Sequence, residues 1–291
     1  MRNFTKPSVP IPKALSAVKR GLHSPKKEFF AEQENDLEAL FREYDLLAEK
    51  DELHTLKPRW SISSSDGKDS VESKNQNRHL ANVLYESDRP FVNAHWEAVT
   101  KNNGGGTLYC PICGLHECEE MDHYVPREES MFPEYSTHLS NLIPLCHYCN
   151  HQKGTKFLDA SNKRIFFNAF FDKLDNREIV ECDIIVSPFD GKPQIVTRIH
   201  HSLSATKAPD KYILSTISEL DLLRRFHAKA KLVFLTELTR LQSRAGQDWD
   251  PIKVEMIAVS KPVDNNPDIV GPAVMKAIAN STVMENWFHS L

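Results

Sequence analysis

Apolar residues recur at helical spacing in two stretches of the first hundred residues. Between Glu28 and Glu52 they fall three or four positions apart, at Leu37, Leu40, Phe41, Tyr44 and Leu47. This spacing predicts an amphipathic helix whose apolar face either packs inside the protein or docks another protein. A second helix is predicted from Pro90 to Thr100, where proline suits the first turn and one face carries Phe91, Ala94, His95 and Val99.

The last third of the chain predicts a hairpin followed by helices. Ile179–Ser187 and Gln194–His200 are rich in Ile and Val and flank the turn residues Asp190-Gly191, which is typical of two antiparallel strands. Thr216 and Glu219 have the spacing of a capping box, so one long helix is predicted to begin there. Its buried face would carry Leu220, Leu223, Ala230, Val233, Phe234, Leu238 and Leu241. A shorter helix is predicted near Pro272–Asn280.

The chain of 291 residues is long enough for one large or two smaller domains. The polar stretch Ser61–Arg78 is nearly devoid of apolar residues, which is typical of a surface loop or linker. No apolar run approaches the ~18–20 residues of a membrane-spanning helix, and the first residues do not resemble a secretory signal. We therefore expect a cytoplasmic protein with no membrane contact.

Charge is unevenly distributed along the chain. The net charge of -4 does not match a dedicated nucleic-acid-binding protein, so any such surface must be local. The first 27 residues carry seven basic residues and no acidic one, whereas Glu28–Glu52 carries ten acidic and two basic residues. The basic segment predicts either an arm that contacts phosphates or a solvated tail. Its four prolines exclude one long amphipathic helix.

Four of the six cysteines form two Cys-x-x-Cys pairs, Cys110/Cys113 and Cys146/Cys149. Such a pair lets two thiolates approach one ion from a tight turn, and two pairs complete the tetrahedral shell that Zn²⁺ prefers in structural sites. We therefore predict a structural zinc on these four thiolates, which would staple the ends of a separate unit. Cys118 and Cys182 are expected to be spare thiols, with Cys118 close enough to be a reserve ligand.

The segment between the cysteine pairs contains an ordered set of polar residues. It includes Met121-Asp122-His123-Tyr124-Val125-Pro126, then Ser140-Asn141-Leu142, and then Cys146-His147-Tyr148-Cys149-Asn150-His151-Gln152-Lys153-Gly154. The order Asp-His, Asn-Leu and Cys-x-x-Cys-Asn-x-x-Lys-Gly resembles the zinc-stapled branch of the HNH endonuclease family, whose active site is a ββα-metal fold. The resemblance covers about 48 of the 291 residues.

The resemblance implies a role for each motif residue. His123 would be the general base that deprotonates a water molecule, and Asn141 would position it from the second strand. Asp122 and Asn150 would hold the catalytic divalent ion, Mg²⁺ or Mn²⁺. Asn150 follows Asn141 by nine positions, which is the spacing expected between the second and third motif residues, although the founding motif has histidine at the third.

The chemistry of phosphodiester hydrolysis agrees with these roles. The reaction needs an activated water and relief of charge on the phosphate and leaving oxygen. A neutral imidazole can activate the water, which accelerates the reaction ~10²–10⁴-fold. A hard cation on oxygen ligands can relieve the charge on the phosphate and the leaving oxygen. Adjacent Asp122 and His123 point to opposite faces of a regular strand, so both can serve one phosphate only at a twisted strand end or turn.

Residues after the second cysteine pair add further candidates. Lys153 and Lys156 are expected to contact a substrate phosphate. For Lys153, an ordinary position at the start of a helix is the alternative. His147 and His151 are close enough to Asn150 to replace it or to add a metal contact.

The segment from Cys110 to Phe157 carries seven acidic residues and three basic ones, so an isolated groove would repel DNA. Basic groups elsewhere, such as Lys163, Arg164 or the N-terminal arm, or a protein partner must then complete the substrate surface. Flanked HNH nucleases of this kind occur as effectors in bacterial phage defence, sometimes beside an ATPase as in Septu-type systems, and this chain resembles that group. We therefore expect DNA as the substrate and an ATPase subunit as a partner.

Together these features predict an α+β protein. Its ββα-metal HNH core, stapled by a four-cysteine zinc site, would occupy residues 81–175. A basic arm and amphipathic helical region would precede it in residues 1–80, and a C-terminal hairpin with helices, suited to docking a partner, would follow in residues 176–291. We expect an endonuclease that hydrolyses DNA phosphodiester bonds with a divalent metal. A non-catalytic zinc module that binds nucleic acid or protein is the alternative.

Overall fold

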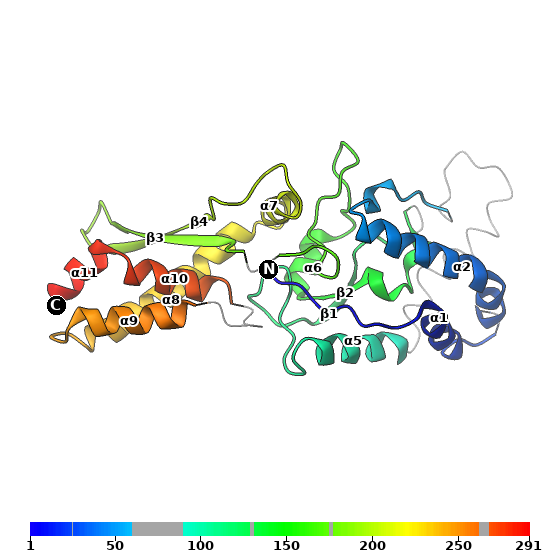
Figure 1. Cartoon of the computed structure of the whole chain (residues 1–291), viewed down its shortest axis with the longest axis horizontal. Helices are drawn as coiled ribbons and strands as arrows, with labels where there is room; N and C mark the ends of the chain where they lie inside the picture. The colour runs from blue at the N-terminus through cyan, green and yellow to red at the C-terminus, as the bar shows by residue number, and fades with distance from the viewer. Residues whose placement is uncertain (25, 60–89, 129–130, 175–176, 262–267) are drawn as a thin grey trace. The chain divides into compact units, whose positions relative to one another are not determined.

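The computed structural model describes residues 1–24, 26–59, 90–128, 131–174, 177–261 and 268–291. Their contacts divide them into two compact units (Figure 1). Residues 2–112 and 116–173 form the first, called here the N-terminal unit. Residues 174–291 form the C-terminal unit, to which Met1 and residues 113–115 are also assigned. The predicted linker Ser61–Arg78 lies outside the described residues.

Two helices open the N-terminal unit and pack against each other, α1 (Ile11–Arg20) and α2 (Lys26–Glu49). The α1 helix carries Pro12 in its first turn, where a missing N–H leaves no helical hydrogen bond unmade. The predicted amphipathic helix is confirmed as α2. Its apolar positions are buried inside the unit at Phe30, Leu37, Leu40, Phe41 and Tyr44, so this face packs intramolecularly.

The centre of the N-terminal unit is a small ββα arrangement. Strand β1 (Glu120–His123) pairs with β2 (Leu142–Leu145) in an antiparallel register that places Asp122 opposite Ile143 and His123 opposite Leu142. Helix α6 (His147–Lys153) follows β2 directly and contacts β1. All of β2 and three of the four residues of β1 are buried, so this sheet lies in the core rather than on the surface.

Helices from outside the ββα unit hold it in place. The second predicted helix is confirmed as α5 (Pro90–Asn102). Figure 1 shows β1 and β2 between α2 and α5. The α5 helix contacts β2 through His95, whose Nε2 lies 3.0 Å from the carbonyl of Leu142. The described residues of this unit also form three short 3₁₀ turns, η1 (Leu53–Thr55), η3 (Pro133–Tyr135) and η4 (Leu139–Asn141).

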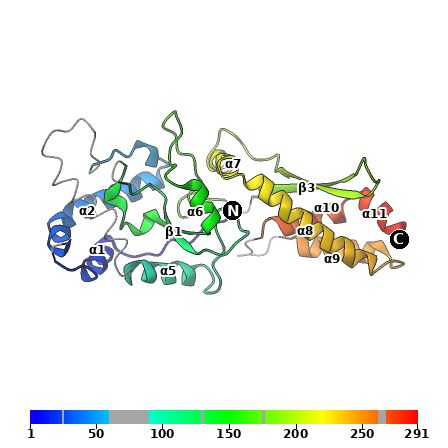
Figure 2. The same cartoon turned by 180° about the vertical axis from the view of Figure 1, so that it is seen from behind.

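The C-terminal unit is built on the predicted hairpin. Strands β3 (Val180–Val186) and β4 (Pro193–Ile199) pair antiparallel, and Gly191 in the turn has a positive φ of 70°. Helix α8 packs on β4 and α10 on β3, as both views of the cartoon show (Figures 1 and 2). The helices are α7 (Asp210–Glu219), α8 (Leu222–Gln242), α9 (Trp249–Ser260), α10 (Val270–Ala279) and α11 (Thr282–His289).

The capping box predicted at Thr216 and Glu219 is wrong. Both residues belong to the end of α7, and the Thr216 hydroxyl donates a hydrogen bond of 2.6 Å to the carbonyl of Tyr212 in the preceding turn. The chain then leaves the helical path at Asp221, whose φ of 49° is left-handed, and α8 begins at Leu222. Two helices therefore replace the single predicted one, because Asp tolerates the left-handed conformation that a continuous helix forbids.

Helices and two small antiparallel sheets together make up the described fold, which confirms the predicted α+β class. The helix predicted near Pro272–Asn280 is confirmed as α10. Among the described residues, no helix combines the length and the apolar composition needed to cross a membrane.

Candidate functional site

The four paired cysteines come together around the ββα unit. Their ligand atoms lie within 4.8 Å of one another, and all four residues, Cys110, Cys113, Cys146 and Cys149, are buried. The first pair sits in a tight loop in which Gly114 has a φ of 66° and the Leu115 N–H donates to the Cys113 Sγ at 3.4 Å. The second pair begins α6, with Cys146 as its N-cap residue. This cluster is consistent with a tetrahedral zinc site, whose Zn–S bonds measure ~2.3 Å.

The other two cysteines stand outside this cluster among the described residues. The Cys118 thiol donates a hydrogen bond of 3.4 Å to the carbonyl of Pro144. Cys182 lies in β3, where burial raises the pKa of its thiol to about 11. Cys182 therefore packs as a neutral thiol.

The start of the basic arm folds onto the loop that carries the first cysteine pair. The Arg2 backbone N–H donates to the carbonyl of Pro111 at 2.8 Å, and its guanidinium donates to the carbonyl of Tyr109 at 3.3 Å. Phe4 is also buried, and its N–H donates to the carbonyl of Ala169 at 2.8 Å. Burial lowers the pKa of Arg2. This part of the arm is therefore held against the protein rather than extended from it.

His123 ends β1 with its side chain buried, at 8% exposure. Its Nε2 lies 2.8 Å from the carbonyl of Ser136, so Nε2 carries the proton of the neutral ring and Nδ1 carries the lone pair. Burial lowers the pKa of His123 to about 3, although the hydrogen bond to Ser136 acts against this. The imidazole is consequently neutral at pH 7, which is the form that a general base requires.

Asn141 is fully buried, and both ends of its side-chain amide are hydrogen-bonded. Its Oδ1 accepts from the N–H of Val125 at 2.7 Å and from the hydroxyl of Tyr44 at 3.0 Å. Its Nδ2 donates to the carbonyls of Val125 at 3.0 Å and Tyr135 at 3.2 Å. Because Ser136 follows Tyr135, these contacts also fix the carbonyl that orients His123. This arrangement suits the positioning role expected for Asn141.

Asp122 and Lys153 form a buried ion pair. The Lys153 Nζ lies 3.0 Å from Oδ2 and 3.1 Å from Oδ1 of Asp122, and it donates to the carbonyl of His123 at 2.8 Å. Burial raises the pKa of Asp122, and the ammonium opposes that effect. The structure therefore differs from the expectation for Lys153, because an ammonium held between two buried acceptors is not presented to a substrate phosphate.

The two adjacent motif residues Asp122 and His123 have separate surroundings. Asp122 faces α6, whereas His123 contacts the loop that contains Ser136. This is the alternation of a regular strand, so the twisted end that would bring both to one phosphate is not observed. Lys156 lies exposed, two residues beyond Gly154, whose φ of 52° ends the helix.

Asn150 lies beside Glu120, a residue that the sequence analysis missed. The Asn150 Nδ2 donates to Oε2 of Glu120, and the other carboxylate oxygen, Oε1, lies 2.6 Å from Nδ1 of His147. The His147 ring stacks at 5.9 Å on that of His151. The available signal was position, because Glu120 precedes Asp122 by two residues and therefore shares its strand face.

The comparisons with known proteins agree with this arrangement. Residues 110–156 match the family model of the HNH endonuclease. This segment is therefore similar to the HNH endonucleases and is called the HNH domain below. The HNH domain contains both cysteine pairs and every residue to which the sequence assigned a catalytic or metal-binding role. No curated protein and no solved structure matches the chain.

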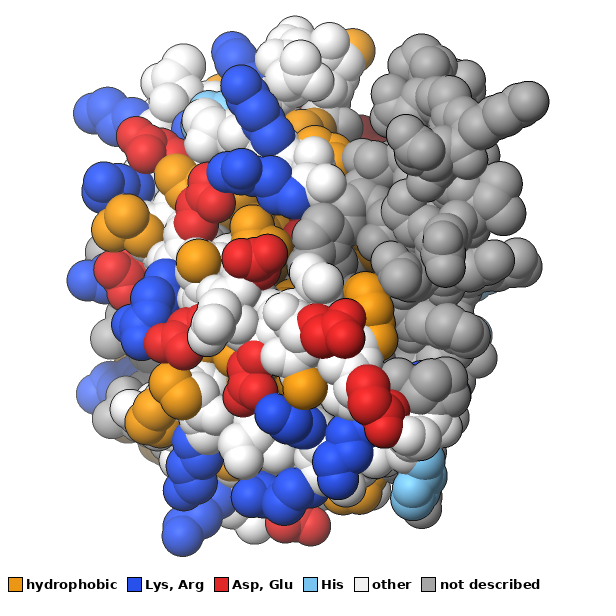
Figure 3. Space-filling view, turned by 90° about the vertical axis from the view of Figure 1, so that its right-hand side faces the viewer, with side chains coloured by type: hydrophobic (Ala, Val, Ile, Leu, Met, Phe, Trp, Pro, Cys, Tyr) orange, Lys and Arg blue, Asp and Glu red, His pale blue; other side chains and the backbone are white. Residues whose placement is uncertain are grey.

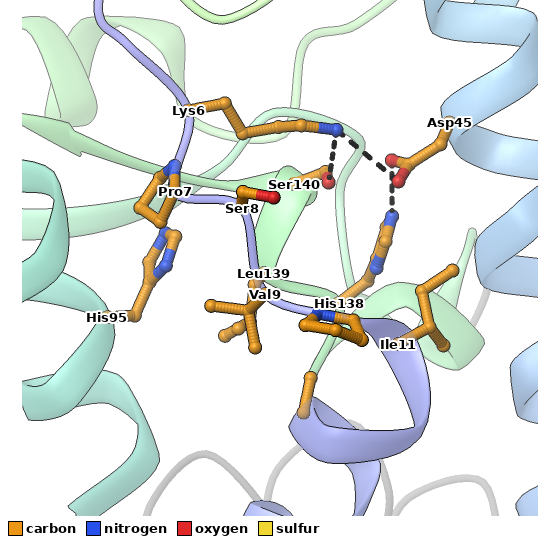
Figure 4. Close-up of a pocket in the computed structure, with 12 residues that line it drawn as sticks. Lys6, Pro7, Ser8, Val9, Ile11, Asp45, His95, His138, Leu139 and Ser140 are labelled. Carbon is orange, nitrogen blue, oxygen red and sulfur yellow. Dashed lines mark hydrogen bonds and ion pairs between the residues drawn. The ribbon is translucent and has the colours of Figure 1, made fainter. Parts of the chain in front are cut away.

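A pocket of about 200 Å³ is lined by the N-terminal arm, α2, α5 and the loop that leads to Asn141 (Figure 4). Asp45 of α2 binds His138 at 3.0 Å and Lys6 at 3.4 Å, and the Lys6 Nζ also donates to the Ser140 hydroxyl at 3.2 Å. Burial favours the neutral acid, but the contacts with His138 and Lys6 prevail and lower the pKa of Asp45 to about 2. The basic arm and α2 thus support the HNH domain through this ionic network.

Two of the basic residues expected to supply positive charge to the HNH domain are paired with acidic residues instead. The expectation that Arg164 contacts the substrate is wrong. Its side chain is 1% exposed and pairs with Asp51 at 2.8 Å and with Asp172 at 2.6 Å. Lys19 of the arm pairs with Glu34 at 2.7 Å. On the face of the N-terminal unit drawn in Figure 3, basic and acidic side chains are interspersed across the described part.

Two buried histidines predict how stability depends on pH. Burial lowers the pKa of His95 to about 4 and that of His123 to about 3. In the unfolded chain both take up protons below ~6.5, so acid favours the unfolded state. The free energy of unfolding should therefore fall by about 1 kcal/mol for each of these histidines between pH 7 and 5.5. Urea titrations at the two pH values measure this loss.

The variant His123→Gln should lose about 1 kcal/mol less than the wild type over the same interval. His289→Gln is the matched control, because His289 is exposed in α11 and should leave the pH dependence unchanged. Identical pH dependence in the wild type and His123→Gln would show that His123 is not held neutral by burial.

Proposed function

We propose that this chain is a metal-dependent endonuclease that hydrolyses DNA phosphodiester bonds. The observation that carries the proposal is the match of residues 110–156 to the HNH endonucleases. The proposal is supported by the neutral His123 at the end of β1, which a backbone carbonyl orients. It is also supported by the cluster of four cysteines that could bind zinc.

In this proposal His123 accepts the proton of the attacking water at Nδ1, while the Ser136 carbonyl holds the Nε2–H. Asn141 holds the chain after His123 in place through its hydrogen bonds to Val125 and Tyr135. A divalent cation, Mg²⁺ or Mn²⁺, would relieve the charge on the phosphate and the leaving oxygen. Asp122 and Asn150 do not fit such an ion as a pair, because each is bonded to a different partner, Lys153 and Glu120.

Removal of the imidazole tests the proposed activity. The variant His123→Ala should nick supercoiled plasmid ~10²–10⁴-fold more slowly than the wild type in Mn²⁺ or Mg²⁺, because it lacks the general base. His116→Ala is the control, since His116 is an exposed histidine in the loop of the first cysteine pair. Zinc content should be equal in all three proteins. Equal nicking by His123→Ala and the wild type would contradict the mechanism and favour the non-catalytic zinc module.

We propose further that the chain is the effector of a bacterial anti-phage system and docks an ATPase subunit through its C-terminal unit. The acidic HNH domain motivates a partner, since substrate must be brought to a domain in which acidic residues outnumber basic ones. Large exposed apolar side chains support the docking region. Among the described residues of the C-terminal unit, they include Ile185, Val186, Phe189, Leu232, Leu235, Val254, Ile257 and Val259, with Phe189 97% exposed.

Purification of the tagged chain from its own cells tests this partner. We expect an ATP-hydrolysing subunit to be recovered with the wild type, and Leu232→Lys to reduce the recovery because it places a charge on the apolar surface. Leu46→Lys, at an exposed leucine of the N-terminal unit, is the matched control and should retain the subunit. Recovery of the chain alone, with full nuclease activity, would refute the proposal.

A further inference from the structure

A second group of possible metal ligands lies in the C-terminal unit. In the part of the chain that the structure describes, two groups of at least three His, Cys, Asp or Glu residues bring one ligand atom each within 4.8 Å of one another. One group is the cysteine cluster, and the other consists of Glu181, His200 and His201. The second group lies outside the residues that match the HNH endonucleases.

The β3–β4 hairpin brings these three residues together at the end away from its turn. Glu181 in β3 is paired with Arg198 in β4. The backbone N–H of His200, directly after β4, donates to the carbonyl of Ile179 at 2.9 Å, which extends the pairing by one step. The chain turns at His201, and the rings of the two histidines stack with their centres 4.5 Å apart. Residues about twenty positions apart in the sequence therefore share one small region of the surface.

The distances between the ligand atoms suit one divalent ion. The His201 Nδ1 lies 3.0 Å from Oε2 of Glu181. Bonds from zinc to nitrogen or oxygen measure ~2.0–2.2 Å, which places neighbouring ligand atoms ~3.0–3.5 Å apart around a tetrahedral ion. An ion can therefore replace the proton that this pair shares. A ring nitrogen of His200 lies within 4.8 Å of both ligand atoms, so a small rotation of its side chain completes a set of three.

Neighbouring groups hold these ligands in position. Oε2 of Glu178 lies 3.1 Å from Nε2 of His200, and the Ser202 hydroxyl lies 2.8 Å from Nδ1 of the same ring. Whichever nitrogen binds the ion, the other keeps a hydrogen-bond partner, which is the arrangement that orients metal-bound imidazoles. Arg198 donates from Nε to Oε1 of Glu181 at 3.2 Å and so leaves Oε2 for the ion.

We propose that Glu181, His200 and His201 bind an exchangeable divalent ion of the later transition metals, with Zn²⁺ as the representative ion. Two imidazoles and one carboxylate suit these metals, whereas Mg²⁺ and Ca²⁺ prefer oxygen ligands alone. Three protein ligands leave at least one coordination position for water, and the His201 side chain is 79% exposed, so the site is open to solvent. The site does not depend on the nuclease function proposed above.

The ion is an addition to a hairpin that forms without it. Strands β3 and β4 are joined over seven residue pairs and are covered by α8 and α10. Glu178 is not counted as a ligand, because the ammonium of Lys276 lies 2.8 and 3.0 Å from its two oxygens. Removal of the ion should therefore leave the fold of the C-terminal unit unchanged.

Chemical modification of histidines tests the site directly. The full-length chain, with zinc on its four cysteines, is treated with diethyl pyrocarbonate at increasing Zn²⁺, and peptide mass spectrometry measures the rate of modification at His201. An imidazole bound to a metal through one nitrogen carries its proton on the other, so no lone pair remains for the reagent. Zn²⁺ at ten times its dissociation constant should therefore slow the modification of His201 about tenfold.

Variants and a second histidine supply the controls. Glu181→Gln and His200→Ala should each raise the Zn²⁺ concentration that protects His201 by at least about tenfold, because each removes a ligand. Glu219→Gln, at an exposed carboxylate of α7 in the same unit, should not change that concentration. His289, exposed in α11, should react at the same rate with and without Zn²⁺. Far-ultraviolet circular dichroism shows whether each variant is folded.

Two results would overturn the assignment. One is a wild type in which Zn²⁺ leaves the modification of His201 unchanged. The other is protection of His201 that persists undiminished in folded Glu181→Gln and His200→Ala, which would place the ion elsewhere. Failure of the proposed nuclease is distinct, because it would leave the protection of His201 intact in a protein that does not nick plasmid.

Discussion

The convergence of four buried cysteine sulfurs is the constraint on which the HNH domain depends. The two strands of this domain have four residues each, and its α-helix has seven. A two-stranded sheet is marginal in water, and so is a helix of two turns. A zinc ion on the four thiolates would join the loop before β1 to the start of α6 and so close this small unit. The position of every motif side chain follows from that closure.

A second layer of support comes from residues far away in the sequence. Tyr44 of α2 donates to Asn141, Asp45 binds His138, and His95 of α5 bonds to Leu142. These contacts fix the loop between β1 and β2, which carries the Ser136 carbonyl that orients His123. The N-terminal helices are therefore part of the construction of the site, in addition to anything they contribute to substrate binding.

The features that could be predicted from the sequence are those set by residues close together in the chain. The cysteine pairs, the α2 stripe and the β3–β4 hairpin each follow from spacings of a few residues, and all three are confirmed. The pairing of Lys153 with Asp122, and of Asn150 with Glu120, depends on how α6 lies across β1, which no local spacing fixes. The burial of Arg164 depends on Asp51, more than one hundred positions away. The end of α7 at Thr216–Glu219 was missed because a left-handed Asp221 leaves no pattern in the sequence.

Hydrogen–deuterium exchange of the full chain, with its zinc bound and after removal of the metal by a chelator, tests the dependence on the cysteine cluster most directly. We expect the amides of β1, β2 and α6 to lose their protection when zinc is removed, whereas those of the β3–β4 hairpin in the C-terminal unit retain theirs. Unchanged protection of β1, β2 and α6 in a chain verified to be free of zinc would contradict it.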